Sequence, residues 1–238
     1  MPTVPFPTPP ETVLLKLGGE ALQPDRERGL GRQALQRVAR QLVTLCSQGV
    51  RLGVVVGGGN WWRGRDVAFI DRVSADQMGM LATALNGLAL RAALEREGQA
   101  CLVQSAIPLA FCDPLDSRRA KQALSQGGVV IFVGGTGNPL VSTDTAAALR
   151  AVELGAEVLL KATTVDGVYD QDPRSHPEAV RYSQLSFNEV LEKRLEVMDL
   201  AAFDLCQQHR VPIVVFDFKG ADNLHNVVKN PAVGTLIC

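Results

Sequence analysis

The sequence lacks the residue groups on which metal centres, disulfide frameworks and membrane spans depend. Its five cysteines form no Cys-x-x-Cys pair, and its three histidines are too few to assemble a metal-ligand spacing. No stretch approaches the roughly 20 apolar residues of a membrane helix, and no basic segment followed by an apolar run opens the chain. These absences predict reduced thiols, no metal held by protein side chains, no membrane partner and a cytoplasmic location.

An excess of charge of one sign is also missing. Across 238 residues, 24 Lys and Arg face 25 Asp and Glu, so the formal net charge is -1. Nucleic-acid binding depends on clustered cations that neutralise many phosphates, and this balance argues against it. Aromatic residues are scarce at 5%, but the hydrophobic share of 46% is ample for a buried core. Any anionic ligand must therefore be held by a few local groups.

The amino-terminal segment differs in composition from the rest of the chain. Five of its first ten residues are prolines, which favour an extended, solvated backbone over helix or sheet. We expect residues 1–11 to form a proline-rich flexible tail outside the fold. From Thr12 onward, short apolar runs alternate with amphipathic stretches, a rhythm typical of βα units with a parallel sheet. Residues 12–238 are expected to form a single α/β domain.

The apolar pattern predicts individual elements. Continuous runs of Val, Ile and Leu predict strands covered on both faces at 13–17, 50–56, 100–104, 129–133, 157–160 and 212–216. Apolar residues at helical spacing predict helices at 32–47, 73–97, 116–125, 143–155 and 187–209. Segment 162–185 breaks the alternation with Asp-Gly, Asp-Pro and His-Pro dipeptides, which mark turns. Long loops inside compact domains are often functional.

Three glycine-rich turns follow three of the predicted strands, at Gly18-Gly19, at Gly57-Gly58-Gly59 and from Gly134 to Pro139. Glycine lets the backbone approach a phosphate closely, and free N–H groups at a helix start supply donors, so together the turns favour a shared polyphosphate site. Each turn alone could simply be a tight connection. No Gly-Lys dipeptide occurs, and the dinucleotide fingerprint lacks its third glycine. A Walker A loop and an ordinary Rossmann dehydrogenase are both disfavoured.

Cationic side chains accompany the first two glycine turns. Lys16 lies in an otherwise apolar strand just before the first turn. A buried lysine is costly unless it meets an anion, which favours a phosphate partner, although its ammonium could also reach solvent. Arg63 follows the second turn and could clamp phosphate oxygens with two parallel hydrogen bonds. Arg65 could do the same, and the spacing does not choose between them.

Carboxylates accompany the third turn and the long loop. Ser142-Thr143-Asp144 opens a predicted helix, where helix capping explains the residues as well as ligand binding does. Asp166, Asp170 and Asp172 crowd the long loop. Turn formation and contact with a nucleotide or magnesium are the two interpretations of this cluster.

Seven further motifs occur in order along the chain. They are LLKLGGEAL at 14–22, VVGGGN at 55–60 with Arg63-Gly64, DxMGMLAT at 76–83 with NGLA at 86–89, SAIPL at 105–109, GTGNP at 135–139, KAT at 161–163 with VDGVY at 165–169, and VMDLAAF at 197–203. In this order they resemble the motifs of the bacterial UMP kinases of the amino acid kinase family, and the resemblance extends over nearly everything from Thr12 to Cys238.

The resemblance implies a three-layer α/β/α sandwich with a mostly parallel central sheet, one half holding ATP and the other UMP. It implies ATP-dependent phosphorylation of UMP to UDP in pyrimidine nucleotide biosynthesis, with Mg²⁺ arriving on the ATP phosphates. It also implies a homohexamer, with GTP as activator and UTP as inhibitor.

The resemblance also assigns site residues. The implied catalytic residues are Lys16, Arg63 and Asp144. The implied ATP-binding residues are Lys16, Leu17, Gly18, Gly19, Gly59, Arg63, Thr163, Tyr169 and Asp172. The implied UMP-binding residues are Gly58, Asp76, Thr136, Gly137, Asn138, Pro139, Leu140, Val141, Ser142 and Thr143.

Two other functions fit the same fold. A carboxylate or carbamate kinase would make an acyl phosphate, but the GTGNP and DxMGM motifs look specific to kinases of nucleotides. A nucleotide-binding storage or regulatory protein would bind without turnover, and the retention of Lys16, Arg63 and Asp144 argues against this second alternative.

Overall fold

The structure, a computed structural model, describes residues 6, 9–24, 28–64, 69–195, 197–220 and 222–238. In this part of the chain a nine-stranded sheet has the order β4-β3-β5-β2-β1-β6-β8-β9-β7. Its strands are β1 (Thr12–Leu17), β2 (Arg51–Val56), β3 (Cys101–Ser105), β4 (Asp113–Pro114), β5 (Val129–Val133), β6 (Val158–Thr163), β7 (Gln184–Leu185), β8 (Ile213–Asp217) and β9 (Thr235–Ile237). The pairs are parallel except β8 with β9, which is antiparallel.

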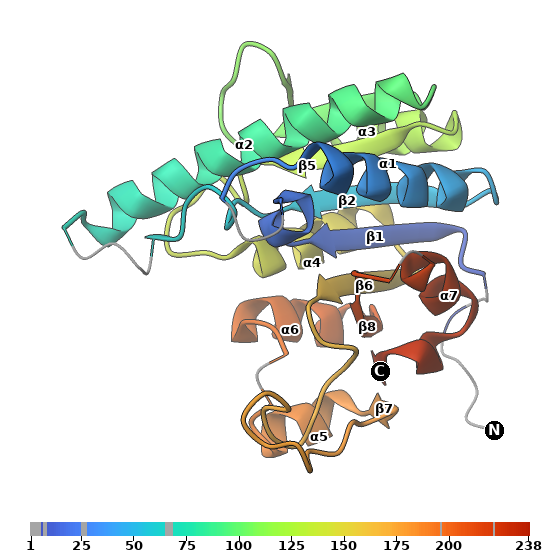
Figure 1. Cartoon of the computed structure of the whole chain (residues 1–238). Coiled ribbons are helices and arrows are strands. Elements are labelled where there is room, and N and C mark those ends of the chain that lie inside the picture. Colours follow the sequence, from blue (N-terminus) through green and yellow to red (C-terminus); the bar gives the residue numbers. More distant parts are fainter. Residues whose placement is uncertain (1–5, 7–8, 25–27, 65–68, 196, 221) are drawn as a thin grey trace.

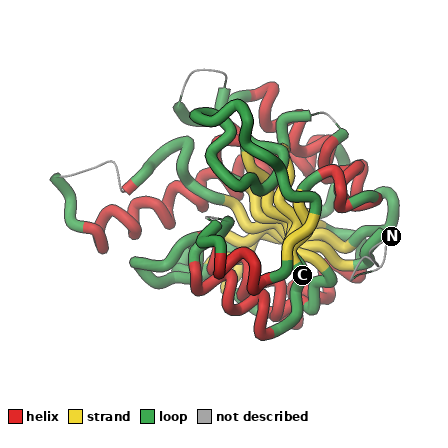
Figure 2. Tube along the Cα trace, turned by 90° about the horizontal axis from the view of Figure 1, so that it is seen from below, coloured by secondary structure: helices red, strands yellow, loops and turns green. Residues whose placement is uncertain are grey.

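Helices cover both faces of the sheet. They are α1 (Arg32–Cys46), α2 (Arg72–Arg96), α3 (Ser117–Ser125), α4 (Thr143–Leu154), α5 (Phe187–Glu192), α6 (Leu200–Gln208) and α7 (Asn223–Lys229), with short 3₁₀ turns at Gly19–Leu22 and Pro231–Val233. Apolar residues of α1, α2 and α7 form one core cluster with the sheet, and those of α3 to α6 form the other. Figure 2 shows the strands at the centre with helices around them. The three-layer sandwich with a mostly parallel sheet is confirmed.

Side-chain alternation along β1 decides what each face receives. Val13, Leu15 and Leu17 belong to the α1 and α2 cluster, whereas Leu14 belongs to the α4 cluster. Because successive strand residues point to opposite faces, Lys16 shares the α4 face with Leu14. Lys16 therefore lies in an otherwise apolar strand, on the face of the sheet that α4 covers.

The six strands predicted from apolar runs are confirmed to within two residues at their amino ends and three at their carboxyl ends. Four of the five predicted helices are confirmed as well. The fifth, 187–209, was wrong as a single helix, because α5 ends after Glu192 and α6 begins at Leu200. Between them Arg194 adopts φ +53°, which a helix does not accommodate, and the Asp199 side chain caps α6 by accepting from the N–H of Ala202.

Two further features differ from the sequence-based expectations. Phe6 and Pro10, from the segment expected to lie outside the fold, are buried, and Phe6 belongs to the α1 and α2 core cluster. An aromatic side chain stabilises the fold by burial whatever prolines surround it. Elements β4, β7, β9 and α7 were not predicted, since each is too short for a periodic pattern to stand out.

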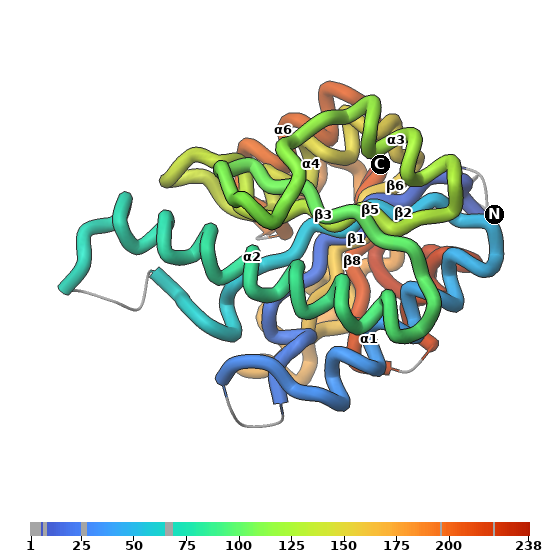
Figure 3. The backbone as a smooth tube through the Cα atoms, turned by 90° about the horizontal axis from the view of Figure 1, so that it is seen from above, coloured from blue at the N-terminus to red at the C-terminus, as the bar shows by residue number. Residues whose placement is uncertain are grey.

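Helix α2 is the longest helix, and Figures 1 and 3 both show its amino-terminal part extending beyond the sheet. Among the described residues no helix combines the length and hydropathy needed to cross a bilayer.

Candidate functional site

Lys16 and Lys161 flank the carboxylate of Asp144. The Lys16 Nζ lies 2.8 Å from Asp144 Oδ1, and the Lys161 Nζ donates to Asp144 Oδ2 at 2.7 Å. All three side chains are about 85% buried, with 14 to 15% of their surface exposed. With two cations and one anion, the cluster carries a net charge of +1 and suits an anionic ligand.

The topology of the sheet brings this cluster together. β1 and β6 are parallel neighbours in which Lys16 pairs in register with Lys161, and Figure 1 shows the two strands side by side. The chain fills one half of the sheet with β2 to β5 and the other with β6 to β9, so the strand order reverses at β1. Ligands of open α/β sheets bind at the carboxyl ends of the strands at such a switch point. Asp144 reaches it from the first turn of α4.

Burial and charge act in opposite directions on this cluster. Burial raises the pKa of the Asp144 carboxyl, but the ammonium groups of Lys16 and Lys161 outweigh burial and hold it below its usual range. Burial lowers the pKa of Lys161, helped by the like charge of Lys16 and opposed by Asp144. Asp144 is therefore an anion that keeps two neighbouring cations in place.

The first two glycine turns pack backbone against backbone. A Cβ at Gly19 would lie 2.9 Å from the Gly59 amide nitrogen and 3.0 Å from the Gly57 carbonyl oxygen, so only glycine fits there. Arg63 pairs with Glu20 across the two turns, at 2.6 Å between Nη2 and Oε1, and its Nε donates to the Gly59 carbonyl at 3.3 Å. The predicted phosphate clamp is thus already paired with a carboxylate. Its alternative, Arg65, lies outside the described residues.

Several predicted UMP-binding residues line one small pocket of about 160 Å³, which we call the helix pocket. Gly58, Asp76, Val141 and Thr143 belong to its lining. Two more of them are tied to its rim, because the Leu140 N–H donates to Asp76 Oδ2 at 2.9 Å and Ser142 caps α4. The lining also includes residues that were not predicted to bind UMP, namely Trp62, Gly64, Ala75, Gly79, Met80, Thr83 and Gly135. The Trp62 indole donates to the Ala75 carbonyl at 2.8 Å, which fixes one wall.

Four of the predicted ATP-binding residues line two further cavities, namely Gly18, Thr163, Tyr169 and Asp172. The loop cavity, about 530 Å³, is lined by Lys161, Thr163, Tyr169 and Asp172 together with neighbouring parts of the long loop. The glycine cavity, about 430 Å³, is lined by Gly18, Glu20 and again Thr163. Thr163 joins the two cavities, so they form one extended surface beside β6.

Other predicted residues lie outside these cavities. Leu17 has a fully buried side chain, and its carbonyl accepts from the Gly57 N–H at 2.8 Å. Thr136, Gly137, Asn138 and Pro139 form the turn before Leu140, where the Thr136 hydroxyl accepts from the Asn138 N–H at 3.2 Å. These residues line neither the helix pocket nor the loop and glycine cavities, and the same holds for Lys16, Gly19, Gly59 and Arg63.

The carboxylates of the long loop serve the loop itself. Asp172 accepts from the N–H of Arg174 at 3.0 Å, Asp170 accepts from the N–H of Val180 at 2.8 Å, and Asp166 accepts from the Tyr169 hydroxyl at 2.7 Å. Turn formation is the role that these contacts support. Asp170 and Asp172 nevertheless line the loop cavity.

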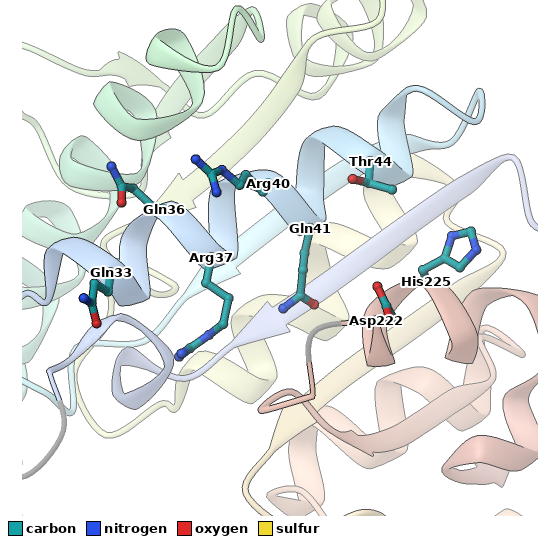
Figure 4. A pocket seen from close by; sticks show the side chains of 8 residues that line it. All are labelled: Gln33, Gln36, Arg37, Arg40, Gln41, Thr44, Asp222 and His225. Atoms are coloured by element: carbon teal, nitrogen blue, oxygen red, sulfur yellow. The ribbon is translucent and has the colours of Figure 1, made fainter.

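A separate cavity of about 440 Å³ lies between α1 and α7 (Figure 4). In the described part of the chain it contains none of the predicted site residues. Its wall includes Arg37, Gln41 and His225, and Arg37 also borders the glycine cavity. Figure 4 shows Arg37 and Gln41 pointing from α1 toward the space beside α7.

The model of the amino acid kinase family matches residues 11–217, which include the whole lysine and aspartate cluster. The chain belongs to the amino acid kinase family. A uridylate kinase of Psychrobacter sp. (strain PRwf-1) is 48% identical, with 94% of this chain and 95% of the relative covered.

Two solved structures are similar to this amino acid kinase over nearly its whole length. One is the UMP kinase of Ureaplasma parvum, with a TM-score of 0.90, 33% identity, and 95% of this chain and 98% of that chain covered. The other is the UMP kinase of Bacillus anthracis, with a TM-score of 0.90, 34% identity and 95% of each chain covered.

Sequence reasoning missed two residues of this amino acid kinase that the structure places at the cluster. Lys161 was seen only as part of a motif, although it is a lysine in an apolar strand, the same signal that identified Lys16. Asp199 accepts from the hydroxyls of Ser142 and Thr145, the latter at 2.8 Å, and so ties α6 to the start of α4. No local pattern distinguishes Asp199 from an ordinary helix cap.

The activity of this amino acid kinase is expected to fall at alkaline pH because of Lys161. A lysine whose pKa is lowered from 10.5 loses its positive charge at a lower pH than a free lysine does. The measurement is kcat/KM from about pH 7 to about pH 11. The Lys161→Arg variant should lack this alkaline decline, since its guanidinium stays protonated. An identical decline in both proteins would assign the titration to another group.

Proposed function

We propose that the protein transfers the γ-phosphoryl group of ATP to UMP, yielding ADP and UDP. The observation that carries the proposal is the cluster of Lys16, Asp144 and Lys161, which adjoins both sites. Lys161 lines the loop cavity, and Thr143, the residue before Asp144, lines the helix pocket. The names of the relatives supply the substrates. The helix pocket takes UMP, and the surface formed by the loop cavity and the glycine cavity takes ATP.

The chemical task is to bring two polyanions together in line. The phosphate of UMP is already an adequate nucleophile, so no general base is needed, and positioning and electrostatics supply the rate. Lys16 and Lys161 neutralise the charge that spreads over the transferred phosphoryl group, and the amino-terminal end of α4 adds a partial positive charge. Asp144 is a positioning residue that holds both ammonium groups toward the same point.

Magnesium fits this site as part of the donor. The Asp144 oxygens already contact two ammonium groups, and the described residues contain no group of three or more His, Cys, Asp or Glu side chains suited to a metal. We therefore propose that Mg²⁺ would arrive with the ATP phosphates and would supply neutralisation of their charge there.

One assay tests the substrates. ADP release from MgATP is measured with UMP, CMP, dUMP, AMP and a set of small carboxylates. Release that depends on UMP is the expected result. Release that depends on a carboxylate, or ATP binding without release, would replace the proposal by an acyl-phosphate-forming kinase or by a protein that binds nucleotides without turnover.

We also propose that the protein is a homo-oligomer, with a hexamer as the expected state. Val73, Met78, Leu81 and Leu85 on α2 are each 40 to 52% exposed, and α2 extends beyond the sheet. Met78, Leu81 and Leu85 lie three, four or seven residues apart and therefore share one helix face, where they form an apolar stripe of the kind that associating proteins cover. GTP activation and UTP inhibition belong to the same expectation from family resemblance.

The role of the apolar stripe in association is tested by the mass of the assembly in solution. The Leu81→Glu variant should dissociate to a smaller species by light scattering coupled to gel filtration, because a buried unpaired carboxylate is costly. The matched control is Leu200→Glu, which changes a leucine that is 75% exposed on α6. Equal masses for both variants and the wild type would remove α2 from the interface.

A further inference from the structure

The acceptor loop, residues 134–142, contains a strained backbone position. Leu140 has φ +68°, in the left-handed region that non-glycine residues rarely occupy. Its side chain is 67% exposed, so packing does not impose this conformation. A strained backbone persists only where neighbouring groups hold it. The group that holds Leu140 must therefore act on its backbone.

That group is Asp76 on α2. Its Oδ2 accepts from the Leu140 N–H at 2.9 Å, which is the contact between the loop and this carboxylate. Arg72, one helical turn earlier, donates from Nε to both oxygens of Asp76 at 3.0 and 2.9 Å. Asp71 caps the helix just before Arg72 by accepting from the Ser74 N–H at 3.0 Å. Arg72 is thus anchored on an ordered helix end, and we call Arg72, Asp76 and the Leu140 N–H the loop latch.

The loop latch borders the helix pocket. Asp76 lines the pocket, and so do Gly135 and Val141, which lie on either side of Leu140 in the loop. Among the described residues that line the helix pocket, Asp76 is the one with a charged side chain. A change in the Leu140 backbone would move Val141 and Thr143, and with them one wall of the pocket.

We propose that Arg72 is a positioning residue for the acceptor nucleotide, acting through Asp76 on the backbone of Leu140. This inference rests on the proposed function, because it takes the helix pocket as the UMP site. Arg72 fixes the Asp76 carboxylate where it holds Leu140 in the left-handed conformation. The loop is then shaped before UMP arrives, and UMP binding does not have to order it.

The first test separates UMP binding from turnover. Arg72→Gln should raise the KM for UMP about threefold to fivefold, while kcat and the KM for ATP stay within about twofold. Arg91→Gln is the matched control, since Arg91 forms the same kind of i,i+4 pair on α2 with Glu95, at 3.9 Å, away from the acceptor loop. Arg72→Lys should fall between Arg72→Gln and the wild type. A KM for UMP equal to that of the control would overturn the proposal.

The second test does not depend on activity. In the nucleotide-free protein, the Leu140 amide should exchange its hydrogen about threefold to fivefold faster in Arg72→Gln than in Arg91→Gln. In a Leu140→Gly background, glycine adopts positive φ without strain, so adding Arg72→Gln should raise the KM for UMP much less. Unchanged exchange, or equal KM increases in the two backgrounds, would contradict the loop latch. If the wild type does not phosphorylate UMP, the proposed function fails while the exchange measurement still decides on the loop latch.

Discussion

Lys16→Ala is expected to lower kcat about a hundred- to a thousandfold while the KM for UMP stays within about threefold. The ammonium of Lys16 lies at the carboxyl end of β1 beside Asp144. In the proposed mechanism it neutralises the charge that develops on the transferred phosphoryl group. An interaction that is needed most in the transition state affects turnover more than substrate binding. Steady-state kinetics with UMP varied at saturating MgATP measure both constants.

Two further variants serve as controls for Lys16→Ala. Lys16→Met keeps the length of the side chain and removes its charge, so it should lose as much activity as Lys16→Ala if the charge is the cause. Lys121→Ala removes an exposed lysine of α3 and should behave as the wild type. Near-wild-type turnover in Lys16→Ala would contradict both the proposed mechanism and the proposal that the lysine and aspartate cluster is the catalytic site.

Asp144→Asn is expected to cost roughly 3 kcal/mol of stability and most of the activity. The amide has the shape of the carboxylate but no charge, so two largely buried ammonium groups remain without their anion. Thermal or urea unfolding measures the loss. Asp113→Asn is the control, because Asp113 pairs with Arg119 at the surface and exposed pairs contribute only about 0–1 kcal/mol.

A double variant separates the two effects of Asp144. Asp144→Asn with Lys161→Met removes one unpaired cation, so stability should recover in part while activity does not. Stability that falls further in the double variant would show that charge imbalance is not the cause.

The stability supplied by Asp144 should also depend on pH. The pKa of this carboxyl is lower in the folded protein than in the unfolded chain. The stability that Asp144 contributes is therefore fully present at a pH above its pKa in the unfolded chain. It is lost as the pH falls through its pKa in the folded protein. Asp144→Asn should lose less stability on acidification than the wild type does.

Much of the site could be predicted from local sequence. Lys16 stood out as a charge in an apolar strand, the glycine turns stood out at strand ends, and Asp144 stood out at a helix start. These signals depend on neighbours in the chain, and the structure brings Lys16, Gly18 and Asp144 to the carboxyl ends of the strands. Local patterns also predicted a parallel sheet covered on both faces, because βα units bury both faces of their sheet, and the family resemblance supplied the three-layer sandwich.

The tertiary structure decided which groups meet. Local sequence was enough to predict the six strands with continuous apolar runs and the glycine turns after them, and it places two lysines in apolar strands. Only the parallel register of β1 with β6 places Lys161 beside Lys16, and only the packing of α4 on that face inserts Asp144 between them. The same holds for Arg63 with Glu20 and for Asp76 with Leu140. Periodicity and turn chemistry act over a few residues, whereas register and helix packing join residues far apart in the chain.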